Sequence, residues 1–354
     1  DYRAATLRSM FYFSLFFPIV SLFAAIATAL IVWVGGGQVL LGGLTFGAFV
    51  AFLQYVDRFF SPIRDLADQY TTLQSAMASS ERIFRVMDEQ ETIVDRADPV
   101  TLEKVRGEVE FRDVWFAYNP NEWVLRGISF HIAPGESVAV VGATGAGKTS
   151  LISLMSRFYD IQKGAVLVDG VDVRDQAQTE LRRHVGAVLQ DPFIFSGTIA
   201  SNIRMGETSI TDDQIRAAAH YVNAAHFIEA LPHGYDEVVR ERGAGLSVGQ
   251  KQLLAFARAI AFNPEILLIL DEATSSVDTE TEALIQDALA KLMKGRTSII
   301  IAHRLSTIRN VDRIIVMHKG KIVEQGHHEE LLARNGYYAR LYELQYADTV
   351  GRAS

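Results

Sequence analysis

A glycine-rich segment from Gly142 to Thr149 has residue types and a spacing suited to holding a phosphate. Its sequence, GATGAGKT, follows a short apolar run and precedes a run with helical character, residues 150–158. Glycines let backbone N–H groups curl around a phosphate, and the N-terminus of a helix adds favourable partial charge. These flanks disfavour the alternative, an ordinary glycine turn. The nucleotide-binding residues predicted here are Gly142, Thr144, Gly145, Ala146, Gly147, Lys148, Thr149 and Ser150.

Two of these residues have further expected roles, and a second motif completes the chemistry. Lys148 can reach the β- and γ-phosphates, and the Thr149 hydroxyl can ligate Mg²⁺. A second apolar run, residues 266–270, ends in Asp271-Glu272. Because a carboxylate at the tip of an apolar strand is unfavourable unless it meets a cation, Asp271 is predicted to hold Mg²⁺, directly or through water. Glu272 could take a proton from the water that attacks the γ-phosphate. Together the motifs predict a nucleoside triphosphatase of undefined class.

The stretch between these motifs defines the class by resemblance. The segment Leu246-Ser247-Val248-Gly249-Gln250 resembles the LSGGQ signature of the ATP-binding cassette (ABC) family. The resemblance implies that Ser247, Gly249 and Gln250 face the nucleotide of a second subunit. A plain helix start that contains glycine is the alternative for this segment taken alone.

Four more residues match the motifs of this family in the family's order. Gln190 resembles the Q-loop glutamine, which senses the γ-phosphate and Mg²⁺, and Asp278 lies in a segment that matches the D-loop. His303, in the sequence IIIAHRLST, resembles the switch histidine that contacts the γ-phosphate. Tyr118 resembles the aromatic residue that stacks on adenine. The alternative for Tyr118 is an aromatic side chain of a strand with no role in binding, and the alternative for His303 is a purely structural histidine. The resemblance thus implies catalytic roles for Glu272, His303, Lys148 and Gln190, and metal contacts for Thr149, Gln190 and Asp271.

One position departs from the family pattern. The signature has Val248 where the family usually has glycine, whereas Glu272 is intact. This combination resembles one half of heterodimeric multidrug-type exporters, in which the partner supplies the standard signature. A heterodimer is therefore favoured, and the alternative is a homodimer that tolerates Val248. Just before the signature, Glu241-Arg242-Gly243 resembles the exporter X-loop, which contacts the membrane domain.

The N-terminal part of the chain has a different composition. No Asp, Glu, Lys or Arg occurs between Ser9 and Val56, although the chain has a net charge of −8. Two apolar runs, residues 10–34 and 44–60, are separated by glycines, which predicts two membrane helices with a glycine-rich turn. Thr45 is a candidate N-cap of the second helix. The alternatives are a buried soluble hairpin and a signal peptide. Arginines flank the stretch on both sides, so both ends are expected in the cytoplasm.

We therefore expect an α/β P-loop NTPase fold of the ABC type, with a mixed sheet and a helical subdomain, preceded by an α-helical transmembrane hairpin. The expected domains are residues 1–89 (the last two transmembrane helices and a cytoplasmic extension), 90–106 (a solvated linker), 107–346 (the nucleotide-binding domain) and 347–354 (a tail). The chain begins with Asp1 close to the first apolar run, so earlier membrane segments are expected to precede it.

The implied function is that of the ATP-hydrolysing subunit of an ABC exporter, which expels drugs, lipids or other amphipathic molecules. ATP and Mg²⁺ are the expected cofactors, and a second half-transporter subunit and membrane lipids are the expected partners. The protein is expected in the inner or plasma membrane as a multi-pass protein, with its nucleotide-binding domain in the cytoplasm. A homodimeric lipid or peptide exporter, a soluble ABC-type ATPase of DNA repair and an importer subunit are alternatives. The negative charge disfavours general nucleic-acid binding, and the absence of cysteine excludes disulfides.

Overall fold

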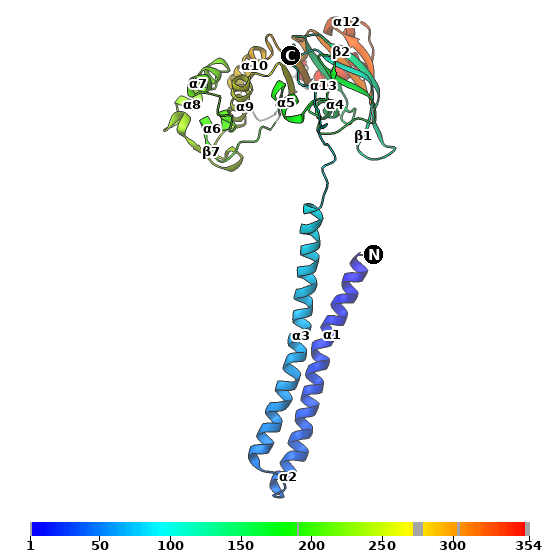
Figure 1. Ribbon diagram of the computed structural model, residues 1–354, viewed down its shortest axis with the longest axis vertical. Helices are drawn as coiled ribbons and strands as arrows, with labels where there is room; N and C mark the ends of the chain where they lie inside the picture. The colour runs from blue at the N-terminus through cyan, green and yellow to red at the C-terminus, as the bar shows by residue number, and fades with distance from the viewer. Residues whose placement is uncertain (1, 190, 272–278, 303–304, 351–354) are drawn as a thin grey trace. The chain divides into compact units, whose positions relative to one another are not determined.

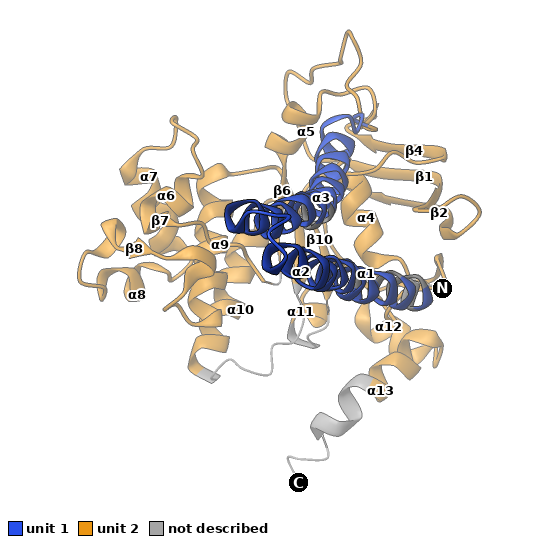
Figure 2. Cartoon of the chain, turned by 90° about the horizontal axis from the view of Figure 1, so that it is seen from below, with its two compact units in different colours: residues 1–91 blue, residues 92–354 orange. Residues whose placement is uncertain are grey.

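The computed structural model divides the chain into two compact units, Asp1–Glu91 and Thr92–Ser354 (Figure 2). It describes residues 2–189, 191–271, 279–302 and 305–350. Residues 92–106, expected as a solvated linker, are part of the second unit, and several of them are hydrogen-bonded to it. Each unit is described separately below.

The first unit is a helical hairpin. Its elements are α1 (Tyr2–Leu30), a π-helical turn η1 (Ile31–Gly35), α2 (Gly36–Leu40) and α3 (Phe46–Met87). Helices α1 and α3 run side by side and are connected at the α2 end (Figure 1). Thr45 is the N-cap of α3, and its hydroxyl accepts a hydrogen bond of 3.2 Å from the Ala48 N–H. The expected cap is thereby confirmed.

The reversal of the hairpin differs from the expected glycine-rich turn. Gly35 to Gly37 have helical backbone angles, so the first helical segment continues to Leu40. The chain turns only afterwards, where Gly42 has a φ of 74°, in the left-handed region that favours glycine. The three consecutive glycines therefore do not end the helix, because glycine can adopt helical φ and ψ angles as well as those of turns.

The apolar stretch of this unit exposes large side chains. Among the described residues, one helical stretch, Met10–Leu40, is long and apolar enough to cross a membrane by length and composition. Along it, Trp33 and Leu40 are 84% and 89% exposed. Helix α3 is apolar at its start and then continues as a charged helix to Met87.

The second unit contains two larger sheets and a layer of helices. A six-stranded sheet has the spatial order β12 (Lys321–Gly326), β11 (Arg313–His318), β3 (Ser137–Gly142), β10 (Thr297–Ala302), β9 (Ile266–Asp271) and β6 (Val185–Val188). Five of these strands are parallel, and β12 is antiparallel at the edge. A four-stranded antiparallel sheet has the order β2 (Trp123–Ile132), β1 (Val109–Ala117), β4 (Lys163–Val168) and β5 (Val171–Asp172). The mixed sheet expected from the sequence is confirmed.

The six-stranded sheet separates two hydrophobic cores. In β3, Val138 and Val140 join a core with β1, β2 and α4 (Lys148–Met155), whereas Ala139 and Val141 join a core with the helical layer. Both faces of the strand are therefore buried, which explains its continuous apolar sequence.

The helical layer supplies the second core and holds the signature segment. It contains α6 (Ile199–Arg204), α7 (Asp212–Tyr221), α8 (Ala225–Glu229), α9 (Val248–Phe262) and α10 (Thr279–Met293). A short sheet, β7 (Gly197–Thr198) with β8 (Val238–Val239), and two 3₁₀ turns, η2 (Gly234–Asp236) and η3 (Glu241–Gly243), lie in the same region. The remaining helices are α5 (Gln178–His184), α11 (Leu305–Arg309), α12 (His328–Ala333) and α13 (Tyr337–Val350). Figure 1 shows α6 to α10 grouped together, apart from α4 and the four-stranded sheet.

Candidate nucleotide site

The predicted motifs follow the carboxyl ends of four adjacent parallel strands. The order β3, β10, β9, β6 places the ends at Gly142, Ala302, Asp271 and Val188 along one edge of the sheet. The register pairs Ala302 with Asp271 across β10 and β9. Because ligands bind outside the carboxyl ends of such strands, this edge is the candidate nucleotide site. Motifs that lie far apart in the sequence are thus brought together by the sheet order.

The glycine-rich segment forms an open loop between β3 and α4. Gly145 and Gly147 have φ angles of 79° and 100°, and Gly147 is the N-cap of α4. A Cβ atom at Gly142 would lie 2.3 Å from the Met317 carbonyl oxygen, whereas one at Gly145 would have no neighbour within 4 Å. Thr144 and Gly145 are exposed and Ala146 is buried, so the loop is packed on its inner side and open outward. This is a cradle into which a phosphate group fits.

Lys148 is positioned inside this cradle. Its side chain is buried, and its Nζ donates hydrogen bonds of 2.7 Å to the Gly142 oxygen and 3.1 Å to the Ala143 oxygen. A cation held by carbonyl oxygens at a helix N-terminus provides positive potential for an incoming phosphate. The neighbouring Thr149 is exposed, as required for a hydroxyl that ligates a bound cation.

Tyr118 lies at the end of β1, beside the first turn of α4. Its hydroxyl oxygen is 3.1 Å from the Ser150 hydroxyl oxygen, and its ring is about half exposed. The Tyr159 ring contacts it edge-on, with the centroids 5.0 Å apart, and Phe116 packs on it in the same way. Tyr159 was not among the predicted site residues. Its place in the aromatic-acidic run FYD just after α4 was the available signal.

The signature residues cap helix α9 in the helical layer. The Ser247 hydroxyl accepts from the Gln250 N–H at 3.2 Å, and the Gln250 side chain accepts from the Ser247 N–H at 2.9 Å. A Cβ atom at Gly249 would lie 2.2 Å from the methyl carbon of Thr281 in α10, so this glycine also permits close helix packing. Val248 begins α9 and is partly exposed. The segment therefore belongs to a different layer from the P-loop (residues 142–149) of the same chain (Figure 1).

The segment that follows Gln190 is tied to the helical layer. Arg258 in α9 donates to the Phe193 oxygen at 3.3 Å and to the Asn202 oxygen at 3.0 Å, and burial lowers its pKa. The Arg242 N–H, from the segment that resembles the X-loop, donates to the Ile194 oxygen at 3.0 Å. Beside this segment is a groove of about 290 Å³, whose lining includes Phe193 and Phe195. The segment that contains Phe193 and Ile194 is therefore hydrogen-bonded to both α9 and η3.

Four predicted site residues, Gln190, Glu272, Asp278 and His303, lie outside the described residues. The backbone of Asp271 is described as the last residue of β9. Within the described ranges, no group of three or more His, Cys, Asp or Glu residues forms a metal site. Among the described residues, those suited to Mg²⁺ are the exposed Thr149, which follows β3, and Asp271 at the end of β9, with β10 between the two strands. The phosphates of a nucleotide would supply further oxygens.

Comparisons with known proteins agree with this geometry. Residues 125–275 match the family model described as ABC transporter. The probable multidrug resistance ABC transporter ATP-binding/permease protein YheH of Bacillus subtilis (strain 168) is 47% identical over 329 residues, 92% of this chain and 48% of that protein. The ATP-dependent lipid A-core flippase of Syntrophus aciditrophicus (strain SB) is 45% identical over 335 residues, 94% of this chain and 55% of that protein.

A solved structure of a bacterial Atm1-family ABC exporter with ATP bound is also similar. It is 40% identical, with a TM-score of 0.70 over 92% of this chain and 56% of that one. The chain thus spans about half the length of the relatives it matches. The cassette motifs, the sheet order and these similarities together show an ABC transporter ATP-binding domain, in a chain that is similar to ATP-binding/permease proteins of the multidrug and lipid exporter type.

Proposed function

We propose that this chain is the ATP-hydrolysing part of an exporter subunit that expels drugs, lipids or other amphipathic molecules. The observation that carries this proposal is the convergence of four parallel strand ends on the P-loop, in a chain that also has an apolar helical hairpin. The similar multidrug resistance protein and lipid A-core flippase support a substrate of amphipathic character.

Hydrolysis at this site depends on positioning and on charge stabilisation. Tyr118 holds the adenine base, while the backbone N–H groups of the P-loop and Lys148 neutralise phosphate charge. Mg²⁺, held by Thr149, Gln190 and Asp271, would supply further charge neutralisation at the phosphates. Glu272 orients the attacking water and accepts its proton.

The switch residue of the mechanism is His303. It follows β10, the strand between the P-loop strand and the strand of Asp271. Its place in the sequence, directly after Ala302 at the end of β10, supports a contact with the γ-phosphate of a nucleotide in the P-loop. We assign it the role of stabilising that phosphate.

A second cassette completes the site in this proposal. Ser247, Gly249 and Gln250 lie in the helical layer rather than at the P-loop of the same chain, which supports their contact with the nucleotide of a partner, where Asp278 also acts. Val248 places an apolar side chain, 38% exposed, where the family has glycine. We therefore favour a heterodimer in which the partner has the standard signature; a homodimer is the alternative.

The proposed coupling to transport uses the groove beside Phe193 and Phe195. These aromatic side chains are 46% and 49% exposed, and the groove adjoins the chain that follows Gln190. An apolar groove there can receive helices of a membrane domain. We place the protein in the inner or plasma membrane as a multi-pass protein. The ATPase unit is placed in the cytoplasm because arginines flank the apolar stretch on both sides.

The substitution Glu272→Gln tests the mechanism. We expect ATP binding and closure of the cassette dimer to persist while turnover falls by roughly 10²–10⁴-fold, the contribution of a general base. The control is Glu280→Gln, because Glu280 is an exposed glutamate in the first turn of α10. ATP hydrolysis by the Glu272→Gln protein at the rate of the unmodified protein would disprove the assignment.

A second experiment tests the assembly and the class of transporter. We expect purification from native membranes to recover a partner subunit with glycine at the position of Val248 and a weakened catalytic acid. Recovery of copies of this chain alone would support the homodimer. Stimulation of ATP hydrolysis by amphipathic compounds supports an exporter, whereas stimulation by a substrate-binding protein would support an importer.

A further inference from the structure

A buried arginine lies at the far end of the P-loop helix. Arg157 lies just after Ser156, the C-cap of α4, and is only 2% exposed. Its guanidinium donates to the Asp160 carboxylate at 3.2 Å and to the Gln176 backbone oxygen at 2.8 Å, both within the ATPase fold. It also donates to two groups far away in the sequence, the Asp95 carboxylate at 3.0 Å and the Val94 backbone oxygen at 3.0 Å. A buried guanidinium needs such a full set of acceptors.

The same short segment, Ile93 to Asp95, is bound by the start of helix α5. The Gln178 N–H donates to both carboxylate oxygens of Asp95, at 3.1 and 3.2 Å. The Gln178 side-chain amide donates to the Ile93 oxygen and to Asp95, each at 3.1 Å. Asp95 therefore caps α5 from outside the helix, where the N-cap residue Ala177 has no side-chain hydrogen bond.

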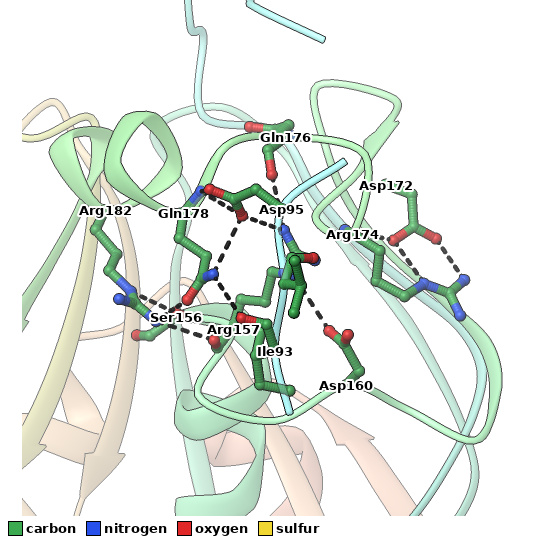
Figure 3. Close-up of polar contacts among 11 residues, drawn as sticks. Ile93, Asp95, Ser156, Arg157, Asp160, Asp172, Arg174, Gln176, Gln178 and Arg182 are labelled. Carbon is green, nitrogen blue, oxygen red and sulfur yellow. Dashed lines mark hydrogen bonds and ion pairs between the residues drawn. The ribbon is translucent and has the colours of Figure 1, made fainter. Parts of the chain in front are cut away.

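Arg182 connects the two halves of this arrangement. It donates to the Gln178 side-chain oxygen and to the backbone oxygens of Ser156 and Arg157, each at 3.0 Å. Figure 3 shows these side chains converging on the segment around Asp95. We define the linker clasp as Ile93, Val94, Asp95, Arg157 and Gln178.

The linker clasp joins segments of the chain that lead to the nucleotide site and to helix α3. Helix α4 begins at the P-loop and ends at Met155, two residues before Arg157, and α5 leads through β6 to Gln190. The clasped segment is separated from the end of α3 by residues 88–92 alone. One short segment is thus hydrogen-bonded to the chain just after α4 and to the start of α5, and these two helices connect to different parts of the nucleotide site.

We propose that the linker clasp is a coupling joint, in which Arg157 and Asp95 act as positioning residues that transmit shifts between α4 and α5 to the chain leading to the membrane helices. This inference rests on the proposed coupling of ATP hydrolysis to transport. It assigns to the linker a path distinct from the groove beside Phe193 and Phe195. Because the clasp residues do not touch the phosphate cradle, their loss leaves nucleotide binding intact.

The test uses the complete transporter containing this chain, with its partner subunit, in lipid nanodiscs. Hydrogen exchange is followed at the backbone amides of residues 93–100, with and without a non-hydrolysable ATP analogue. In the unmodified protein we expect the analogue to change exchange in this segment. In Arg157→Gln we expect hydrogen exchange in this segment to be roughly tenfold faster, because the lost hydrogen bonds to a charged group stabilise the segment by a free energy equivalent to about that factor. We also expect the response to the analogue to be lost.

Kinetic measurements distinguish coupling from simple support of the fold. We expect Arg157→Gln to retain the basal rate of ATP hydrolysis and the KM for ATP, and to lose most substrate transport per ATP hydrolysed. Gln178→Ala and Asp95→Asn provide milder versions should Arg157→Gln fail to fold. The matched control is Arg96→Gln, at the linker residue next to Asp95. This substitution breaks an ion pair of 2.5 Å with Asp175, in which both side chains are exposed.

Two results would overturn the linker clasp as a joint. The first is that the analogue changes hydrogen exchange in residues 93–100 of a folded clasp variant as much as in the unmodified protein. The second is that such a variant transports as much substrate per ATP hydrolysed as the unmodified protein. If the unmodified protein moves no amphipathic substrate, the proposed function fails, and that result is visible without any variant. The exchange measurement still decides the role of the linker clasp in that case.

Discussion

The hydroxyl oxygen of Tyr118 lies 3.1 Å from the hydroxyl oxygen of Ser150, which holds an aromatic ring beside the first turn of the P-loop helix. The Tyr159 ring supports it from the side at 5.0 Å between centroids. The ring is therefore oriented before a nucleotide arrives, while its face remains partly exposed. A base that stacks there meets a surface that is already ordered, which lowers the entropy lost on binding.

This arrangement predicts different results for two substitutions at Tyr118. Tyr118→Ala removes the stacking surface, and because base–aromatic stacking contributes about 1–3 kcal/mol, we expect the KM for ATP to rise by roughly 5- to 150-fold. Tyr118→Phe keeps the ring and loses only the bond to Ser150, so the KM should stay within about threefold. The control is Tyr221→Ala, which removes a partly exposed tyrosine from the helical layer. An unchanged KM in Tyr118→Ala would exclude the adenine contact.

The close approach of Gly249 to Thr281 predicts a structural effect in the signature segment. An added Cβ would lie 2.2 Å from the Thr281 methyl carbon, so Gly249→Ala must displace either the Thr281 side chain or the two helices. Overpacking of this kind destabilises by about 1–3 kcal/mol, which thermal unfolding of the variant would show. Thr281→Ser removes the methyl group and should restore much of the stability in the double variant. A Gly249→Ala protein as stable as the original would show that the helices adjust freely.

The sequence predicted the motif-bearing strand ends well because each motif has a local signal. The helix that follows the glycine-rich loop and the Thr45 cap depend on neighbours within a few positions, and both have the expected local structure. The linker clasp could not be predicted in this way. Asp95 and Arg157 are 62 residues apart, and Asp95 and Gln178 are 83 apart, so only the folded sheet brings them together. Because the sequence near residues 90–106 shows no partner for its charged side chains, it predicts a solvated linker there.

Glycine roles were also ambiguous in the sequence. Gly35 to Gly37 were expected in a turn but are helical, whereas Gly42 makes the reversal. Gly249 was expected to act at a phosphate, and its contact with Thr281 adds a packing role. A glycine permits tight turns, close packing and helices alike, so its sequence position alone does not separate these uses.

His328 predicts a pH dependence of stability. It is buried at the start of α12, with Nδ1 2.7 Å from the Tyr338 hydroxyl oxygen. Burial lowers the pKa of His328 below its ordinary value of 6.5; Glu329 opposes this change and Arg309 adds to it. The unfolded chain therefore takes up the proton more readily than the folded one. The stability that neutral His328 contributes is fully present above pH 6.5 and declines as the pH falls toward the lowered pKa.

Thermal unfolding at several pH values measures this effect. The melting temperature of the ATPase unit should fall between about pH 7.5 and pH 5.5, and His328→Gln should make this decline shallower. The control is His233→Gln, at an exposed histidine, which should leave the slope unchanged. Equal slopes for His328→Gln and the original protein would show that another group causes the acid sensitivity.

Lys148 predicts the largest loss of activity among the described residues. Its buried ammonium is held by the Gly142 and Ala143 oxygens at the place where phosphate charge must be met. Removing one donor to a developing charge slows a reaction by about 10²–10³-fold. We therefore expect Lys148→Ala to weaken ATP binding and to reduce hydrolysis by at least this factor. Lys148→Arg should also fail, since a planar guanidinium does not replace a compact ammonium in a buried site.

Lys163→Ala is the matched control for this prediction. The Lys163 ammonium lies 5.7 Å from the Trp115 ring and 5.8 Å from the Trp123 ring, on the four-stranded sheet. Its loss removes the same charge and a cation–π contact of about 0.5–1 kcal/mol, so only stability should change slightly. The readouts are titration of ATP binding and the rate of phosphate release. Phosphate release by Lys148→Ala at the rate of the Lys163→Ala protein would remove Lys148 from the catalytic site.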